Sequence, residues 1–295
     1  MNGGPHEAYE VAVCQFEPQF LDMAANLQTI ADLSRRASAL GAQLALFPEC
    51  CVTGYGTGEL GADVAARAEV VRGPDRGPAV RLLETLADEL NLHLVVGMPE
   101  RDDGAVYNAA VHVAPGGGAI SSFRKVHMWA GEEAHFTSGE GFSASDAPSG
   151  MLASLICFDL EFPEAARAAV VAGATLVAVS TANMKPWEEY QYVYARARAM
   201  ENSTYVAVAN CVGRVGADEF FGQSLVVDPW GTVLDRASGG EAILTCTIDP
   251  SVVSAARARL GYFEHRKPET YGCATAEGSP TGTPGRSPSA TYPGK

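Results

Sequence analysis

The segment 151–181 reads MLASLICFDLEFPEAARAAVVAGATLVAVST, and the order of its features indicates an α/β fold. Its apolar run 151–156 is typical of a buried strand, Pro163 opens a helical stretch, and 175–181 is a second buried strand. Continuous apolar strands that alternate with helices are typical of a sheet covered on both faces. The first strand ends at Cys157, which is either a core residue or a nucleophile at the mouth of a site.

The same alternation of strands and helices extends along the chain in both directions. The predicted strands before this segment are 11–16, 42–47 and 92–100, the helices are 23–40 and 79–90, and a hairpin surrounds the glycines at 116–118. After it, the prediction is a helix over 186–202 and strands over 204–212, 222–228 and 241–248. Two similar halves with their helices outside predict an α-β-β-α sandwich. In the first helix, the apolar residues at helical spacing are Leu27, Ile30, Leu33, Ala37 and Leu40.

The overall composition limits the classes of partner. A formal charge of −14 disfavours nucleic acid and anionic membranes, because both would repel the chain. The N-terminal segment MNGGPHEAYE lacks the features of a signal peptide, and no apolar run approaches the ~20 residues needed to cross a bilayer. The seven cysteines include no CxxC pair. We therefore expect a cytoplasmic protein with free thiols.

Three polar residues follow apolar strands, where ligands meet side chains in sheets of this kind: Glu49, Lys125 and Cys157. A thiol acts as a nucleophile when a base takes its proton or a cation stabilises the thiolate, and Glu and Lys could supply these two functions. Each residue also has a simpler explanation: a solvated or helix-capping acid, a surface lysine, and an inert buried thiol. Only the combination favours catalysis.

A metal site and a cysteine–histidine site are the two other possibilities. The six histidines form no HxH or HExxH pattern, so we expect no metal. His127 or His135 could instead activate Cys157, as in a cysteine protease, and this is the competing mechanism. We expect Cys14, Cys211 and Cys246 to be core residues.

Three blocks, in this order, resemble the nitrilase, or carbon–nitrogen hydrolase, superfamily: LALFPECCVTGY (44–55), FRKVHMWAGEEAHFTSG (123–139) and LICFDLEFPEAAR (155–167). Weaker similarities occur at 195–210 and 222–231. The resemblance implies one domain over 9–265 with an α-β-β-α sandwich, a homodimer or higher homo-oligomer, and no cofactor. The segment 266–295, rich in Gly, Pro and Ser, is then a C-terminal extension that is flexible or lies on a partner subunit.

The resemblance also implies roles at matching positions. The implied roles are nucleophile for Cys157, general base for Glu49, oxyanion stabilisers for Lys125 and the backbone N–H of Phe158, and substrate positioning for Glu132, with Glu133 as the less favoured alternative. We expect Asp159 to hold the turn by hydrogen bonds. The chain departs from the family pattern at Glu161, where an arginine is frequent, and at Ser138, where a proline is usual.

The residues after the cysteine bear on the reaction. True nitrilases usually have Trp-Glu there and N-carbamoyl-D-amino-acid hydrolases an Asn, whereas Phe158-Asp159 is nearer the amidase branches. The resemblance implies hydrolysis of small aliphatic or ω-amides to carboxylate and ammonia through a cysteine thioester. The alternatives are an N-carbamoyl-amine or amino-acid hydrolase, a nitrilase, or a non-catalytic binding protein of this fold. The expected substrate contacts are Tyr55, Trp129, Asn183 and Trp187, the last of which could equally be a helix-packing aromatic.

Overall fold

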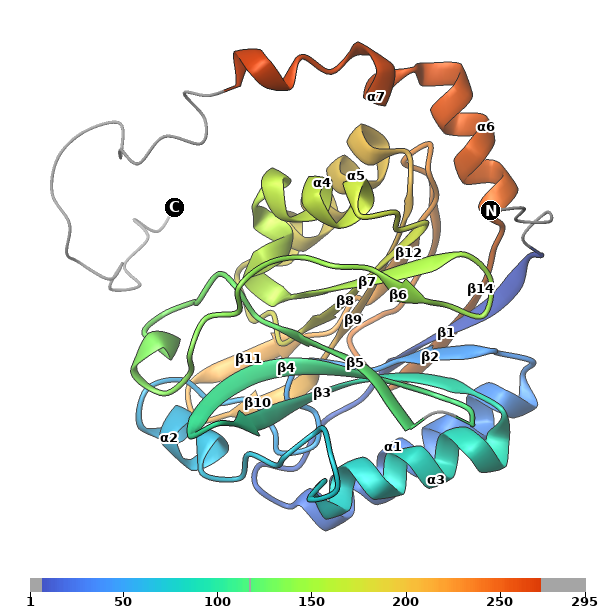
Figure 1. Ribbon diagram of the computed structural model, residues 1–295. Coiled ribbons are helices and arrows are strands. Elements are labelled where there is room, and N and C mark those ends of the chain that lie inside the picture. Colours follow the sequence, from blue (N-terminus) through green and yellow to red (C-terminus); the bar gives the residue numbers. More distant parts are fainter. Residues whose placement is uncertain (1–6, 117, 272–295) are drawn as a thin grey trace, which may run out of the picture.

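Two stacked sheets lie between two layers of helices in the computed structural model, which describes residues 7–116 and 118–271 (Figure 1). The predicted α-β-β-α sandwich is confirmed. Of the predicted C-terminal extension, 272–295 lie outside the described residues.

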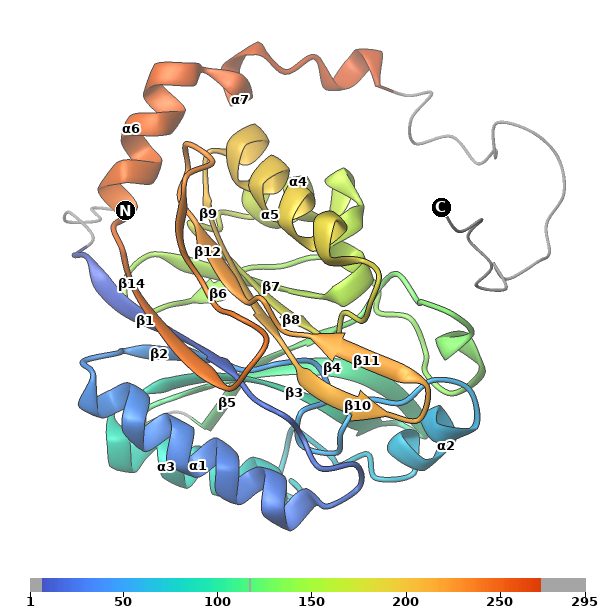
Figure 2. The same cartoon turned by 180° about the vertical axis from the view of Figure 1, so that it is seen from behind.

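The first sheet has the strand order β14-β1-β2-β3-β4-β5. Its parallel centre is β1 (Tyr9–Gln15), β2 (Leu44–Leu46) and β3 (His93–Asp102). Antiparallel neighbours complete it: β14 (Ala242–Ile248), β4 (Ala105–Ala114) and β5 (Gly118–Arg124). Helices α1 (Met23–Ala39) and α3 (Pro78–Leu90) cover its outer face (Figures 1 and 2).

The second sheet has the order β13-β12-β9-β8-β7-β6 and the same plan. Its parallel centre is β7 (Met151–Ile156), β8 (Leu176–Thr181) and β9 (Tyr205–Asn210). The antiparallel strands are β6 (Ser145–Asp146), β12 (Leu225–Val227) and β13 (Val233–Arg236). Helices α4 (Pro163–Val171) and α5 (Glu188–Asn202) cover its outer face, and the expected helix start at 186 is two residues early.

Both faces of the central strands are buried, which explains their unbroken apolar runs. In β1, Val11 and Val13 pack in the core shared with the second sheet. Ala12 and Cys14 point the other way and pack in the core under α1 and α3. Because successive side chains of a strand point to opposite faces of the sheet, one strand contributes side chains to two hydrophobic cores.

Several smaller elements were not predicted, because they are short or carry little apolar pattern. The strands among them are β6, β10 (Val212–Val215), β11 (Asp218–Phe221) and β13, and the helices are α2 (Glu59–Ala65), α6 (Pro250–Leu260) and α7 (Tyr262–His265). Three 3-10 turns are also among them: η1 (Glu132–Ala134), η2 (Cys157–Glu161) and η3 (Pro268–Thr270). The predicted helix over 23–40 extends one residue too far, because α1 ends at Ala39, and Leu40 just beyond it is 60% exposed. In the described part of the chain, no helix combines the length and apolar character needed to span a membrane.

Candidate active site

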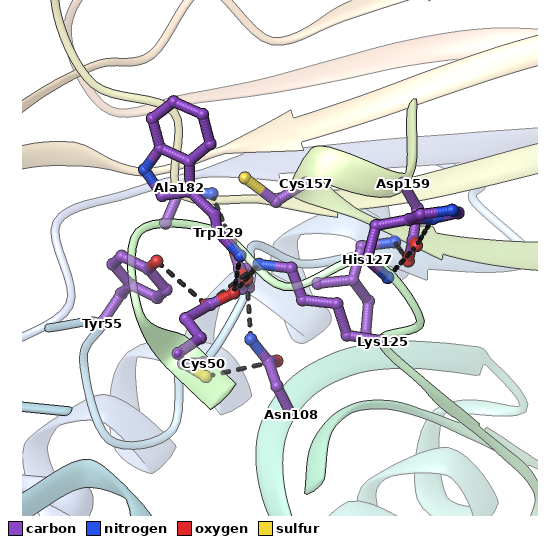
Figure 3. Close-up of polar contacts among 12 residues, drawn as sticks. Cys50, Tyr55, Asn108, Lys125, His127, Trp129, Cys157, Asp159 and Ala182 are labelled. Carbon is purple, nitrogen blue, oxygen red and sulfur yellow. Dashed lines mark hydrogen bonds and ion pairs between the residues drawn. The ribbon is translucent and has the colours of Figure 1, made fainter. Parts of the chain in front are cut away.

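Glu49 and Lys125 form a direct contact, although 76 positions separate them in the sequence. Figure 3 shows the polar contacts around Lys125. Glu49 follows β2 and Lys125 follows β5, and Lys125 Nζ donates to Glu49 Oε1 at 2.9 Å. Both side chains are fully buried. The solvated acid and the surface lysine are therefore excluded as explanations of these two residues.

A second carboxylate completes the cluster from the other side. Lys125 Nζ lies 2.9 Å from Glu132 Oε1 and 2.7 Å from Oε2. Burial alone would lower the pKa of Lys125, but Glu132 and Glu49 together raise it well above its usual range, so the ammonium persists. Glu133 is exposed, and Glu132 is thus the acid that faces the cluster.

Glu49 is fixed in position by hydrogen bonds to both of its carboxylate oxygens. Asn108 Nδ2 donates to Oε1 at 2.7 Å, and the backbone N–H of Ala182 donates to Oε2 at 3.0 Å. Burial raises the pKa of Glu49 and the nearby Glu132 adds to this, while Lys125 and Asn108 oppose it. A carboxylate with a raised pKa is a stronger base than an exposed one.

Glu132 is held by two further donors. Tyr55 donates its hydroxyl to Oε1 at 2.9 Å, and the backbone N–H of Trp129 donates to Oε2 at 2.8 Å. Tyr55 is only 3% exposed and thus buttresses Glu132. Its predicted contact with substrate stays a prediction.

Cys157 stands at the bend between strand β7 and the 3-10 turn η2. Its φ of +46° lies in the left-handed region that non-glycine residues rarely adopt. Such strained bends between a strand and a helix are used elsewhere to present a nucleophile. The next N–H, that of Phe158, belongs to the first turn of η2, where amides have no partner within the helix.

Asp159 holds this bend, as expected. Its Oδ2 accepts from the N–H of Ile156 at 3.2 Å, and its Oδ1 accepts from the N–H of His127 at 2.9 Å. The ring Nδ1 of His127 also lies 2.8 Å from Oδ1. The ring stacks on Phe162 with centroids 3.7 Å apart. The residue before Cys157 and the segment after Lys125 are therefore tied together.

The thiol of Cys157 lies next to the loop that holds Glu49. Its Sγ is 3.2 Å from Oδ1 of Asn183, the neighbour of Ala182. Burial raises the pKa of the thiol, Glu49 raises it further, and Lys125 opposes them. A thiol with a raised pKa needs a base to take its proton before it can act as a nucleophile.

Both histidines of the competing mechanism are engaged elsewhere. His127 bonds Asp159, and His135 Nε2 lies 2.9 Å from the carbonyl oxygen of Gly58. The geometry therefore favours Glu49 as the base for Cys157. Within residues 7–116 and 118–271, no group of three or more His, Cys, Asp or Glu side chains could hold a metal ion.

A pocket opens at Cys157. Three of the four expected substrate contacts, Trp129, Asn183 and Trp187, line it, and Tyr55 does not. The complete lining is Trp129, Cys157, Phe158, Glu161, Asn183, Met184 and Trp187.

Sequence reasoning missed Asn108, Ala182 and Met184. One signal was available for Asn108, because it is a polar residue within the buried strand β4, and such residues need hydrogen-bond partners. Ala182 donates its backbone N–H to Glu49, and Met184 lines the pocket from a loop. Neither contact can be predicted from the residue type.

The family model described as carbon–nitrogen hydrolase matches residues 10–258. The protein named "hydrolase in pqqF 5′ region" of Pseudomonas protegens is 34% identical over 264 residues, which cover 88% of this chain and 90% of that protein.

Two solved structures share the fold. Nit3 of Saccharomyces cerevisiae, described as a member of branch 10 of the nitrilase superfamily, superposes with a TM-score of 0.82 at 27% identity, covering 89% of this chain and 98% of that one. A mutant of the amidase from Nesterenkonia sp. AN1 superposes with a TM-score of 0.79 at 28% identity, covering 92% and 97%. That structure is described as showing covalent addition of the acetamide moiety of fluoroacetamide at the active-site cysteine.

Proposed function

Because the chain belongs to the carbon–nitrogen hydrolase family of the nitrilase superfamily, and is therefore a hydrolase of non-peptide C–N bonds, we propose that Cys157 is its nucleophile. The proposed substrates are small aliphatic or ω-amides, which yield a carboxylate and ammonia. The observation that carries the proposal is the buried cluster of Glu49, Lys125 and Glu132 beside a thiol on a strained bend. A pure binding protein has no need of such a cluster.

In the first half of the reaction, Glu49 takes the proton of Cys157 while the sulfur attacks the amide carbon. The oxyanion that forms is held by Lys125 and the N–H of Phe158, and each such donor is commonly worth about 3 kcal/mol. The C–N bond then breaks as Glu49 returns the proton to the leaving nitrogen. Ammonia leaves, and the acyl group remains on sulfur as a thioester.

In the second half, water replaces ammonia. Glu49 takes a proton from the water, the resulting hydroxide attacks the thioester carbon, and the C–S bond breaks. The products are the carboxylate and the free thiol of Cys157, which regains its proton from Glu49. Glu132 positions the ammonium of Lys125 throughout, because both of its oxygens lie within 3 Å of Nζ.

The adduct in the amidase from Nesterenkonia supports a covalent step at the matching cysteine. The pocket supports a small substrate, because three large aromatic side chains, Trp129, Phe158 and Trp187, line it around Cys157.

Ammonia release from a panel of small amides, carbamoyl compounds and nitriles tests the proposal. We expect release from the amides, and a loss of at least about a thousand-fold in Cys157→Ala, because the nucleophile is gone. Cys246→Ala is the matched control, since Cys246 lies in β14, outside the pocket lining, and should keep its activity. An active Cys157→Ala, or a wild type that releases ammonia only from nitriles or carbamoyl compounds, would contradict the proposal.

The same assay separates the two candidate bases. Glu49→Gln should lose activity as severely as Cys157→Ala, while His127→Ala and His135→Ala should stay within about ten-fold of wild type. The reverse pattern would establish the cysteine–histidine mechanism.

A further inference from the structure

Glu161 lines the pocket that contains Cys157, together with the aromatic residues Trp129, Phe158 and Trp187. A carboxylate on the wall of a small, largely aromatic pocket is unusual, because desolvation penalises its charge. Burial raises the pKa of Glu161, and the nearby Arg198 only partly opposes this.

Arg198 does not neutralise the Glu161 side chain, because its guanidinium is committed elsewhere. Nε donates to the carbonyl oxygen of Leu160 at 2.9 Å, and Nη2 donates to the backbone carbonyl of Glu161 at 2.6 Å. Nη1 pairs with Glu201 at 3.2 Å. Throughout residues 7–116 and 118–271, no ion pair reaches the Glu161 carboxylate. Glu161 thus lines the pocket without a salt bridge to its carboxylate among the described residues.

The aromatic side chains around Glu161 favour the same kind of ligand. The Trp129 ring lies 5.0 Å from that of Phe158 and 6.0 Å from that of Trp187, both edge-on. A cation within about 6 Å of an aromatic face is attracted to it, and more strongly in a desolvated site. An anion would be repelled by Glu161, and the net charge of −14 would also disfavour its approach.

We propose that Glu161 selects amides that carry a protonated amine at the far end of a short acyl chain. This inference rests on the proposed amidase function and names the substrate class of that site. Cys157 would hold the amide carbon and Glu161 the ammonium. The two residues are the first and last of η2, and a rise of about 2 Å per residue separates their Cα atoms by roughly 8 Å, the span of a short aliphatic chain.

The test uses three amides with the same four-methylene spacer and different end groups: 5-aminopentanamide (cationic), hexanamide (neutral) and adipamate (anionic). We expect wild-type kcat/KM to be at least ten-fold higher for 5-aminopentanamide than for hexanamide, and lowest for adipamate. Glu161→Gln should remove the preference for the cation, and Glu161→Arg should favour adipamate. The matched control is Glu164→Gln, because Glu164 is exposed on α4, three positions further along, and should keep the wild-type order.

The outcomes distinguish the two proposals. Ammonia from none of the three amides in wild type would overturn the amidase function and the selection with it. Hydrolysis of all three at similar kcat/KM would overturn the selection alone, and so would a preference for 5-aminopentanamide that survives in Glu161→Gln. The wild-type comparison needs no variant, so a folding defect in a Glu161 variant would not leave the selection untested.

Discussion

At the residue scale, the neighbours of Glu49 set its strength as the proposed base. Burial raises its pKa, and the hydrogen bond from Asn108 is one of the contacts that limit the rise. As the proposed base, Glu49 must be ionised to take a proton. We therefore expect activity to be lost as the pH falls through this raised pKa.

Replacing Asn108 with leucine should shift the acid limb of the kcat/KM profile to higher pH. A hydrogen bond to a charged group is worth roughly 1.5–3 kcal/mol, so its loss destabilises the ionised form of Glu49. At about 1.4 kcal/mol per pKa unit, we expect a shift of about one unit or more.

Asn202→Leu is the control for Asn108→Leu. Asn202 is a buried asparagine that donates to the carbonyl of Arg198 in α5, so its replacement also removes a buried hydrogen bond. It should lower stability and leave the acid limb in place. A limb that does not move in Asn108→Leu would contradict the role given to this contact.

At the element scale, the bend between β7 and η2 depends on Asp159. Its carboxylate accepts hydrogen bonds from the backbone N–H of Ile156 and from the backbone N–H and ring Nδ1 of His127. Asp159→Ala should lower the free energy of unfolding by about 3 kcal/mol, because each buried donor left unsatisfied costs about 1–3 kcal/mol. It should also lower kcat, because Cys157 loses its fixed orientation. Denaturant unfolding and steady-state kinetics measure the two effects.

Asp228→Ala provides the comparison for Asp159→Ala. Asp228 accepts from the N–H groups of Trp230 and Thr232 in a turn outside the pocket lining. Its loss should destabilise the protein without lowering kcat in the folded enzyme. An unchanged kcat in Asp159→Ala would contradict the role proposed for this bend in orienting Cys157.

The sequence predicted the elements best where burial leaves a strong pattern. The helices over 23–40 and 79–90 match α1 and α3 closely, because one face of each helix is buried. The β10–β11 hairpin escaped prediction, because its strands have four residues each and are partly exposed.

The site was predictable only in part, for a related reason. The positions of Glu49, Lys125 and Cys157 after strands suggested a shared edge, since such a pattern is visible in the sequence. The N–H of Ala182 has no sequence signature, because every residue carries one. The missing counter-ion of Glu161 depends on where the guanidinium of Arg198 points, which only the structure gives.

At the scale of the whole molecule, the outer helix layer of the second sheet exposes apolar side chains. On α5, Val193 and Met200 are 46% and 40% exposed, and on α4 Val171 is 58% exposed. Patches of this kind are typical of interaction surfaces. Together with the dimers usual in the family, they lead us to propose that a second copy covers α5.

Light scattering after size-exclusion chromatography checks this proposal. The wild type should have about twice the chain mass of 30.9 kDa, and Val193→Asp should shift it toward monomer, because a buried unpaired charge weakens an interface. Leu40→Asp, beyond the end of α1 on the opposite helix layer, should not. A wild type that is monomeric at micromolar concentration would contradict the proposal.

We propose that Cys157, and no other cysteine, is the reactive thiol. Within residues 7–116 and 118–271, the cysteines with which it must be compared are buried as well: Cys14, Cys50, Cys51, Cys211 and Cys246. The seventh cysteine, Cys273, lies outside the described residues and belongs in the same comparison. Iodoacetamide discriminates among them, because a reactive thiol displaces iodide and keeps the acetamide moiety on sulfur. Peptide mapping by mass spectrometry during inactivation should find this moiety on Cys157, in step with the loss of activity. Inactivation with Cys157 unmodified, or full activity with Cys157 fully modified, would contradict the account.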